Sequence, residues 1–335
     1  MRDRDSFCGH RLFYGFMKVT IIGGGAIGSL LAARLARSGC DVALLVRGDG
    51  FALRDHIQLI DDAGEHKVPL PIEHDPAKLG PQNLIILAVK AHAIGEALPQ
   101  IDPLLGPETI ILTAVNGVPW WFFEGQSTAP ASMVSVDPGS TIAASLKQQP
   151  LVGCVLFPAA HRVAPGVVRH LSGNRIVFGN PRASDNKAAA VAELFAKAEF
   201  ETPIAPDIRA ALWAKLVGNA AVNPLSVIAG ATIQHMAEHP NLSAILTSAM
   251  AEIDAVGAAI TITPMMAQAE RLKLAASVGH HKTSMLQDFD AGRPLELSPL
   301  LGAVREIAQW KSIATPVLDT FHHLIAAKLE ERQSG

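Results

Sequence analysis

The chain has 335 residues, of which 49% are hydrophobic and 18% are charged, a composition typical of globular proteins rather than disordered or fibrous ones. Its net charge of −3 gives no broad basic surface that would hold nucleic acid or an anionic membrane. The length predicts two domains, or one large α/β domain. We therefore expect a globular protein that works on small molecules, with no nucleic acid and no membrane as partner.

The sequence shows no pattern typical of a transmembrane helix, a signal peptide or a disulfide framework. The longest uninterrupted apolar runs, such as residues 84–89 (LIILAV), are far shorter than the ~20 residues that cross a membrane. Residues 1–16 do not resemble a signal peptide, and we expect them to be a disordered extension before Met17, outside the fold. Cys8, Cys40 and Cys154 form no CxxC pair and no even disulfide framework, which favours a reducing, cytoplasmic location.

From Met17 onward, strand patterns alternate with a glycine turn and helical patterns. Four runs are apolar throughout, as in strands buried on both faces: 19–23 (VTIIG), 41–46 (DVALLV), 83–89 (NLIILAV) and 109–115 (TIILTAV). Helices are expected at 29–39, ending at the glycine Gly39, and at 92–105. Strands and helices in this alternation predict an α/β protein with a Rossmann-type, doubly wound parallel sheet.

Two changes of texture follow along the chain. Three short runs broken by Pro and Gly predict an antiparallel meander that closes the first domain: 151–157, 166–171 and 175–180. A helix is expected at 183–198. After Pro206 the sequence predicts helices almost throughout, with starts at Asp207, Asn241, Pro264, Ser298-Pro299 and Thr315-Pro316. We therefore predict a boundary near residue 205, between a Rossmann-type domain (17–205) and an all-helical C-terminal domain (206–332).

The glycine turn is the first candidate binding site. Gly23, Gly25 and Gly28 form G-x-G-x-x-G directly after a predicted strand and at the start of a predicted helix, the context that makes this pattern informative. The helix N-terminus offers N–H groups and a positive dipole end to a pyrophosphate. The alternative is a flexible turn without a ligand. We take the whole turn as cofactor-binding: Gly23, Gly24, Gly25, Ala26, Ile27 and Gly28.

The residue that follows the second strand predicts which nucleotide binds. NAD-specific folds place Asp or Glu there for the ribose 2′-hydroxyl, whereas this chain has Arg47. An arginine suits a 2′-phosphate through a charge-assisted contact. Asp49 lies two residues further on and is the competing ribose ligand. The substitution favours NADP(H), bound by residues 17–205.

Polar residues follow the third and fourth strands at the sheet edge where ligands bind in open α/β folds. These are Lys90 and Asn116, for which a solvated helix start and an ordinary Asn-Gly turn are the alternatives. Next comes WWFF (120–123). Four consecutive aromatic residues cannot all face one way, so we expect at least two to pack in the core and others to line a pocket.

Residues 212–225 (LWAKLVGNAAVNPL) place three polar side chains in an otherwise apolar helix. Lys215, Asn219 and Asn223 recur every four residues, which puts them on one helix face. Reduction of a ketone leaves an alkoxide that needs a proton donor and a stabilising charge, and a lysine supplies both when an apolar environment tunes its pKa. Two neutral amides beside it can bind a hydroxyl or a carboxylate.

Together these motifs resemble the ketopantoate reductase (2-dehydropantoate 2-reductase) family. LWAKLVGNAAVNPL matches the W-x-K-L-x-x-N-x-x-x-N-P signature of that family, and SMLQDFDAGRPLELSPLLG resembles its S-M-x-Q-D…E segment. The resemblance spans Met17 to about Arg332. It implies NADPH-dependent reduction of a 2-keto acid, ketopantoate to pantoate, in pantothenate and coenzyme A biosynthesis, by an oxidoreductase acting on CH–OH groups.

The resemblance also implies roles for individual residues. Lys215 would be the proton donor, and Glu296 would face both the reacting hydroxyl and the nicotinamide ribose. The substrate would contact Asn116, Asn219, Asn223 and Ser284. Lys90 and Asn116 would support the cofactor side, and Ala144 matches a weaker position near the nicotinamide. Ser284 lies at a predicted helix start, where N–H groups favour a carboxylate.

Three departures from the family pattern concern the substrate. Ser298 stands where an Asp is usual, Leu301 where an Asn is usual, and the loop after Asn116-Gly117 is apolar rather than polar. Ser298 before Pro299 still suits a helix cap, so we expect that change to preserve the structure. Leu301 and the apolar loop favour a more apolar pocket, so a related enzyme for a bulkier or more apolar 2-oxo acid is an alternative.

Other classes are also open. A hydroxyisobutyrate or opine dehydrogenase shares the two-domain plan but not the combination of Lys215, Asn219, Asn223, Ser284 and Glu296. A protein that senses NADPH without turnover is a further alternative, although it would have no use for Lys215 and Glu296. Adjacent histidine pairs at 280–281 and 322–323 lack a third ligand at metal spacing, so we expect no metal. The oligomeric state is left open, with a homodimer as one option.

Overall fold

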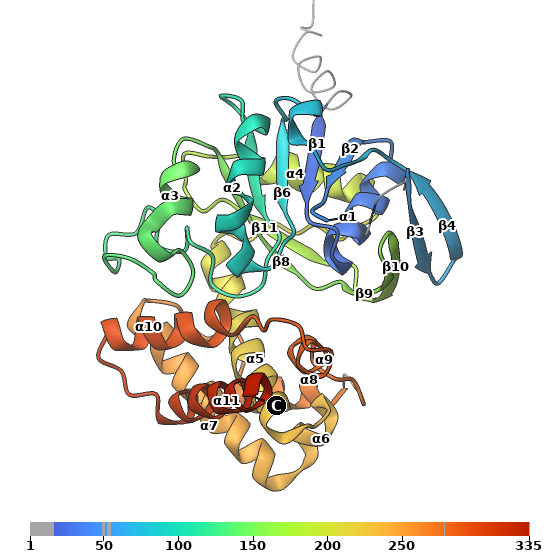
Figure 1. Ribbon diagram of the computed structural model, residues 1–335. Coiled ribbons are helices and arrows are strands. Elements are labelled where there is room, and N and C mark those ends of the chain that lie inside the picture. Colours follow the sequence, from blue (N-terminus) through green and yellow to red (C-terminus); the bar gives the residue numbers. More distant parts are fainter. Residues whose placement is uncertain (1–16, 49–50, 52–54, 278, 335) are drawn as a thin grey trace, which may run out of the picture. The chain divides into compact units, whose positions relative to one another are not determined.

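The computed structural model describes residues 17–48, 51, 55–277 and 279–334. The predicted extension 1–16, with Cys8, and the competing ligand Asp49 lie outside the described residues. The chain divides into two compact units, and Figure 1 shows the elements of each. The first comprises Met1–Val89, Ala93–Val115 and Ser145–Ile208, and the second comprises Lys90–His92, Asn116–Ala144 and Arg209–Gly335.

The first unit contains the expected doubly wound sheet. In the order β11-β8-β7-β6-β1-β2-β5, its strands are β1 (Lys18–Ile22), β2 (Asp41–Leu45), β5 (Ile72–Glu73), β6 (Leu84–Leu87), β7 (Ile110–Thr113), β8 (Leu151–Leu156) and β11 (Ile176–Gly179). Neighbouring strands are parallel, with Ile21 opposite Leu44 and Ile86, and only the pair of β8 and β11 is antiparallel. The apolar runs therefore became central strands because both of their faces are covered.

The predicted antiparallel meander over 151–180 is wrong. β8 and β11 extend the main sheet, while β10 (Val167–Ser172) lies in a separate four-stranded sheet, order β4-β3-β10-β9. The sequence analysis did not predict the other strands of that sheet, β3 (His56–Asp61), β4 (Gly64–Pro69) and β9 (Ala159–Ala164). All residues of β8 are buried but those of β10 mostly are not, and a strand with one wet face cannot enter a sheet covered on both sides.

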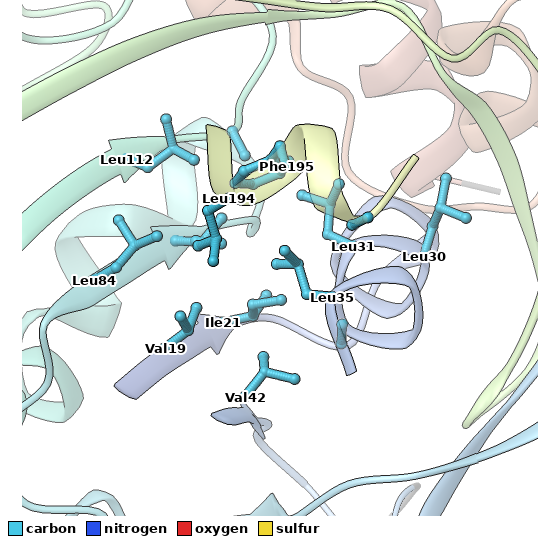
Figure 2. Close-up of a cluster of buried hydrophobic side chains, with 14 of the residues drawn as sticks. Val19, Ile21, Leu30, Leu31, Leu35, Val42, Leu84, Leu112, Leu194 and Phe195 are labelled. Carbon is cyan, nitrogen blue, oxygen red and sulfur yellow. The ribbon is translucent and has the colours of Figure 1, made fainter. Parts of the chain in front are cut away.

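Helices cover the main sheet and close its core. Figure 2 shows Leu30, Leu31 and Leu35 of α1 (Ala26–Arg37) meeting Leu194 and Phe195 of α4 (Ala188–Lys197) over β1, β2, β6 and β7. The helix expected at 92–105 is α2 (Ile94–Ile101), flanked by short 3₁₀ turns at Ala91–Ala93 and Asp102–Leu104. Further 3₁₀ turns occupy Pro76–Lys78 and Pro138–Ser140. Gly39 has φ +87 just after Ser38 caps α1, which confirms the predicted helix end.

The second unit is helical. One of its helices, the short α3 (Thr141–Ser145), comes from the segment 116–144, and the others follow residue 205. These are α5 (Ile208–Ala229), α6 (Ile233–Glu238), α7 (Pro240–Ala259), α8 (Gln268–Ser277), α9 (Ser284–Asp290), α10 (Ala303–Trp310) and α11 (Pro316–Ser334). A single π turn, Ser298–Gly302, precedes α10.

The predicted helix starts in this unit are partly correct. α11 begins at Pro316, as expected. α7 begins one residue before Asn241, because Pro240 takes the first helical position and His239 the cap. Pro264 precedes α8 by four residues and starts no helix, and Ser298 lies inside the π turn, which Leu297 caps.

α7 is the one helix among the described residues whose length and composition alone would allow it to cross a membrane. The sequence of α7 contains no long uninterrupted apolar run, because polar residues such as Glu252 and Asp254 interrupt it. In the second unit the Glu252 carboxylate accepts the N–H groups of Val317 and Leu318, at 2.9 and 3.0 Å. α7 thus supplies the N-terminal cap of α11.

The two units do not follow a single boundary in the sequence. Lys90–His92 begins three residues after the end of β6, and Asn116–Ala144 begins three residues after the end of β7. Both segments nevertheless belong to the helical unit. The predicted division into 17–205 and 206–332 is linear, whereas the second compact unit also includes these two segments from the N-terminal part of the chain.

Candidate active site

The glycine turn of the first unit excludes a Cβ against backbone atoms at two positions and crowds a side chain at a third. Gly23 has φ +113, and a Cβ there would lie 2.8 Å from the Ala88 carbonyl oxygen. A Cβ on Gly28 would lie 1.9 Å from the Gly23 carbonyl oxygen, and one on Gly24 would lie 2.6 Å from the ring of Phe51. The turn, the strand and the helix therefore pack at backbone contact distance.

Gly25 differs from these three glycines because nothing within 4 Å would meet a Cβ there. It caps α1 in an extended conformation with no side-chain hydrogen bond. The first N–H groups of a helix lack partners within the helix, so the open space beside Gly25 lets a phosphate approach them. The residues present fit a dinucleotide pyrophosphate.

Arg47 lies shortly after β2 and is exposed. Its Nη1 lies 3.2 Å from Oε2 of Glu96, and the two side chains are 46% and 70% exposed. An exposed ion pair of this kind contributes only about 0–1 kcal/mol. The guanidinium is therefore available to a stronger anion at small cost.

A polar cluster forms within the second unit from residues far apart in the sequence. Lys215 Nζ of α5 donates to Asn116 Oδ1 at 2.9 Å. Lys90 Nζ donates to Asp288 Oδ2 of α9 at 2.5 Å and to the Pro294 carbonyl oxygen at 2.6 Å. The structure thus brings Lys215 together with Asn116, and fixes Lys90 by a carboxylate that the sequence analysis quoted but gave no role.

Glu296 joins the same cluster electrostatically. Burial raises the pKa of its carboxyl above the usual value, while Lys90, the N–H of Ala91 and Lys215 oppose this rise and Asp288 adds to it. The Ala91 N–H lies 3.5 Å from Glu296 Oε1. Two lysines and two carboxyl groups therefore share one electrostatic environment, in which Glu296 holds its proton more firmly than a solvated carboxyl does.

The other predicted substrate residues occupy separate places in this unit. Asn219 and Asn223 continue the Lys215 face of α5 by one and two turns, half-buried and buried respectively. Ser284 is exposed and is the first residue of α9, as expected. The cap of α9 is Thr283, whose Oγ1 accepts the Leu286 N–H at 3.0 Å. Ala144 is exposed in α3, which the Asp137 carboxylate caps.

Sequence reasoning missed the residues that hold segment 116–144 in place. Arg209 of α5 donates to the carbonyl oxygens of Phe122, at 2.6 Å, and Glu124. The Glu306 carboxylate of α10 accepts the N–H groups of Val134 and Ser135, at 2.7 and 2.8 Å. These partners are 85–172 positions apart in the sequence, and no local pattern links them.

The aromatic run packs mainly inside the second unit. Trp120, Trp121 and Phe122 are 9%, 0% and 2% exposed, which confirms the prediction that at least two of the four are core residues. Phe122 contacts Trp213 and the half-buried Phe123 contacts Trp310, with ring centroids 5.9 and 5.5 Å apart. The loop is apolar because it fills the space between α5 and α10.

Comparison with known proteins identifies the family. Residues 19–183 match the family model described as ketopantoate reductase PanE/ApbA, and residues 207–329 match the model of its C-terminal part. A curated 2-dehydropantoate 2-reductase from Mesorhizobium japonicum is 37% identical over 322 residues, covering 94% of this chain and 99% of the relative. The chain belongs to the ketopantoate reductase family.

Solved structures agree with this membership. A crystal structure from Ralstonia solanacearum MolK2, provisionally assigned as a ketopantoate reductase, matches with a TM-score of 0.86 and 34% identity, covering 95% of this chain and 99% of that one. The 2-dehydropantoate 2-reductase from Geobacter metallireducens GS-15 matches with a TM-score of 0.81 and 25% identity, covering 93% and 100%. The D-mandelate dehydrogenase complex with NADH and anilino(oxo)acetate shares the fold at 22% identity, with a TM-score of 0.80 and coverage of 94% and 99%.

As a ketopantoate reductase family member, the protein is an oxidoreductase acting on CH–OH groups and depends on a pyridine nucleotide. The predicted fold class, a Rossmann-type sheet followed by helices, is confirmed. Of the three departures from the family pattern, Leu301 is 0% exposed and the aromatic loop is largely buried. Both departures therefore place apolar side chains in the interior rather than on the surface.

Proposed function

We propose that this protein reduces ketopantoate to pantoate with NADPH in the cytoplasm, using Lys215 as the proton donor. The observation that carries the proposal is the 2.9 Å hydrogen bond from Lys215 Nζ to Asn116 Oδ1. Each of these residues was predicted from a separate motif, and the bond joins them within a unit that also holds Lys90 and Glu296. Family membership supplies the reaction class.

The chemistry follows from these groups. A nicotinamide bound at the glycine turn would supply the hydride that reduces the carbonyl carbon of the keto acid. Lys215 then donates a proton from its ammonium to the alkoxide oxygen, and its positive charge stabilises that oxygen as it forms. Because Asn116 is a neutral acceptor, it orients the ammonium without neutralising it.

The remaining predicted residues would bind and orient the substrate. Asn219 and Asn223, on the Lys215 face of α5, would hold a hydroxyl and a carboxylate through their amides, and Ser284 would add a hydroxyl. Glu296, whose pKa is raised by burial, would accept a hydrogen bond from the substrate hydroxyl and would also contact the nicotinamide ribose. Lys90, held by Asp288, would support cofactor and substrate.

Cofactor binding would rest on residues of the first unit together with Lys90, Asn116, Ala144 and Glu296. The turn from Gly23 to Gly28 would hold the pyrophosphate. Arg47 would pair with the 2′-phosphate of NADP(H) in place of its exposed contact to Glu96. In this proposal, residues 17–205 would supply the pyrophosphate turn and Arg47, and residues 206–332 would supply Glu296 and the acid Lys215.

A bulkier keto acid is the second candidate, because Ser298, Leu301 and WWFF depart from the family pattern. The burial of Leu301, Trp121 and Phe122 weakens this alternative, since side chains without exposed surface do not contact a ligand in this conformation. Ketopantoate therefore remains the first candidate substrate.

The test is an NADPH-oxidation assay across 2-keto acids of graded size. We expect the highest kcat/KM with ketopantoate, and lower values with larger aromatic keto acids, when loss of nicotinamide absorbance is followed. A higher kcat/KM with an aromatic 2-keto acid would favour the second candidate. Binding of NADPH without oxidation in the presence of any keto acid would indicate a sensor. Sedimentation of the same sample shows whether the protein is a monomer or a homodimer.

A further inference from the structure

In the π turn before α10, the carbonyl oxygen of Pro299 accepts a hydrogen bond from a different segment of the chain, at Val118. In a regular helix the Pro299 carbonyl would accept the N–H of Ala303, four residues on. Here the Ala303 N–H bonds to the Ser298 carbonyl, five residues back. The Pro299 carbonyl instead accepts the N–H of Val118 at 2.8 Å. The wider turn therefore holds residues 117–118 by the backbone, and π turns of this kind often occur at functional sites.

This contact requires glycine at position 117. Gly117 has φ +89, and a Cβ there would lie 2.4 Å from the Pro299 carbonyl oxygen and 2.6 Å from its carbon. Both neighbours are backbone atoms, so no side-chain movement can relieve the overlap. Asn116-Gly117 is thus not an ordinary exposed turn, since the glycine lies against the π turn at contact distance.

The residue fixed next to this contact is Asn116. Its Oδ1 accepts from Lys215 Nζ, and because a lysine ammonium can only donate, the amide oxygen must face the lysine. The amide NH₂ is then turned toward other acceptors. The Gly117 contact therefore fixes the backbone beside Asn116, and Lys215 sets the orientation of its amide.

We propose that Gly117 and the π turn Ser298–Gly302 are positioning elements that hold the Asn116 amide in place, with its oxygen on Lys215 and its NH₂ available to an oxygen of the substrate. The part that concerns the substrate rests on the proposed function. The part that concerns Lys215 does not, because it follows from contacts within the second unit.

The variant that tests this is Gly117→Ala. A Cβ would push residues 117–118 off the π turn and displace Asn116. We expect kcat to fall by about 10- to 100-fold, the loss typical of a ~1 Å misplacement near the reacting atoms. We expect the Kd for NADPH to change less than kcat, because the glycine turn that would hold the pyrophosphate is untouched. The matched control is Gly125→Ala, since Gly125 also has positive φ (+72) in the same loop but open space around it.

Two further measurements separate positioning from general damage. If Gly117 acts through Asn116, then Asn116→Ala with Gly117→Ala should be no slower than Asn116→Ala alone; multiplied losses would overturn the proposal. Independently of turnover, the rate at which an amine reagent labels Lys215, measured by mass spectrometry, should rise severalfold in Gly117→Ala and not in Gly125→Ala. Equal labelling in the two variants would also overturn it, even if ketopantoate proved not to be the substrate.

Discussion

The glycine turn of the first unit and the polar cluster of the second are assembled in opposite ways. The turn uses the backbone of six consecutive residues, and its shape depends on where a Cβ cannot fit. The cluster uses side chains from segments as far apart as Lys90 and Glu296, joined by hydrogen bonds and charge. A site made of contiguous backbone can be read as one motif. A site made of dispersed side chains can be read only part by part, because the contacts between its parts have no local signature.

The variant expected to have the largest effect changes Lys215 in the polar cluster and leaves the glycine turn intact. Lys215→Ala removes the proton donor and one positive charge of the cluster, so we expect kcat to fall by about 10²- to 10⁴-fold, the usual contribution of a general acid. The Kd for NADPH, measured by fluorescence titration, should stay nearly constant because the glycine turn is intact. An unchanged kcat would remove Lys215 from the mechanism.

The converse change is at Arg47 in the first unit. Arg47→Asp removes a charge-assisted contact to the 2′-phosphate and adds repulsion, so we expect NADPH to bind roughly 10- to 100-fold more weakly. The rate of hydride transfer at saturating NADPH should change little. Glu96→Gln is the matched control, because it leaves the guanidinium free and should keep or tighten NADPH binding. A wild-type preference for NADH would contradict the assignment of NADP(H).

The smallest expected effect concerns stability rather than turnover. Burial raises the pKa of Glu296 in the folded protein, so the folded state binds this proton more tightly than the unfolded state and stability rises as pH falls through the folded pKa. Glu296→Gln removes the cost of the buried charge. We expect its Tm to exceed that of the wild type by roughly 1–4 °C above the folded pKa. The difference should shrink as the pH falls through that value, and a difference independent of pH would show that Glu296 is not the group responsible.

The sequence predicted the parts of the fold that depend on local pattern. β1, β2, β6 and β7 were recognisable because strands covered on both faces are apolar throughout, and Gly23, Gly25 and Gly28 because the turn is contiguous. Three strands of the second sheet (β3, β4 and β9) were missed because polar residues interrupt their sequences, most of all in β4 (GEHKVP). Such strands gain their identity from pairing, which a single segment does not reveal.

The polar cluster could be predicted from the sequence only in part. The spacing of Lys215, Asn219 and Asn223 placed them on one helix face, but the contact of Lys215 with Asn116 spans 99 residues. Glu296, Ser284 and Ala144 were singled out by family resemblance alone. Arg209 and Glu306, which bind the backbone of segment 116–144, had no signal beyond their charge. Asp288 belonged to a family motif, but its pairing with the distant Lys90 as well as the nearby Arg293 could not be read from that motif.

The exchange of segments between the two units has a consequence for how the chain can be divided. Phe122 and Phe123 pack against Trp213 of α5 and Trp310 of α10, and Arg209 and Glu306 bind the backbone of the same loop. A fragment beginning near residue 206 would lose these partners and present two tryptophans and two charged groups to water. The helical unit is thus incomplete without residues encoded nearly a hundred positions earlier, and the ribosome has already made them when α5 emerges.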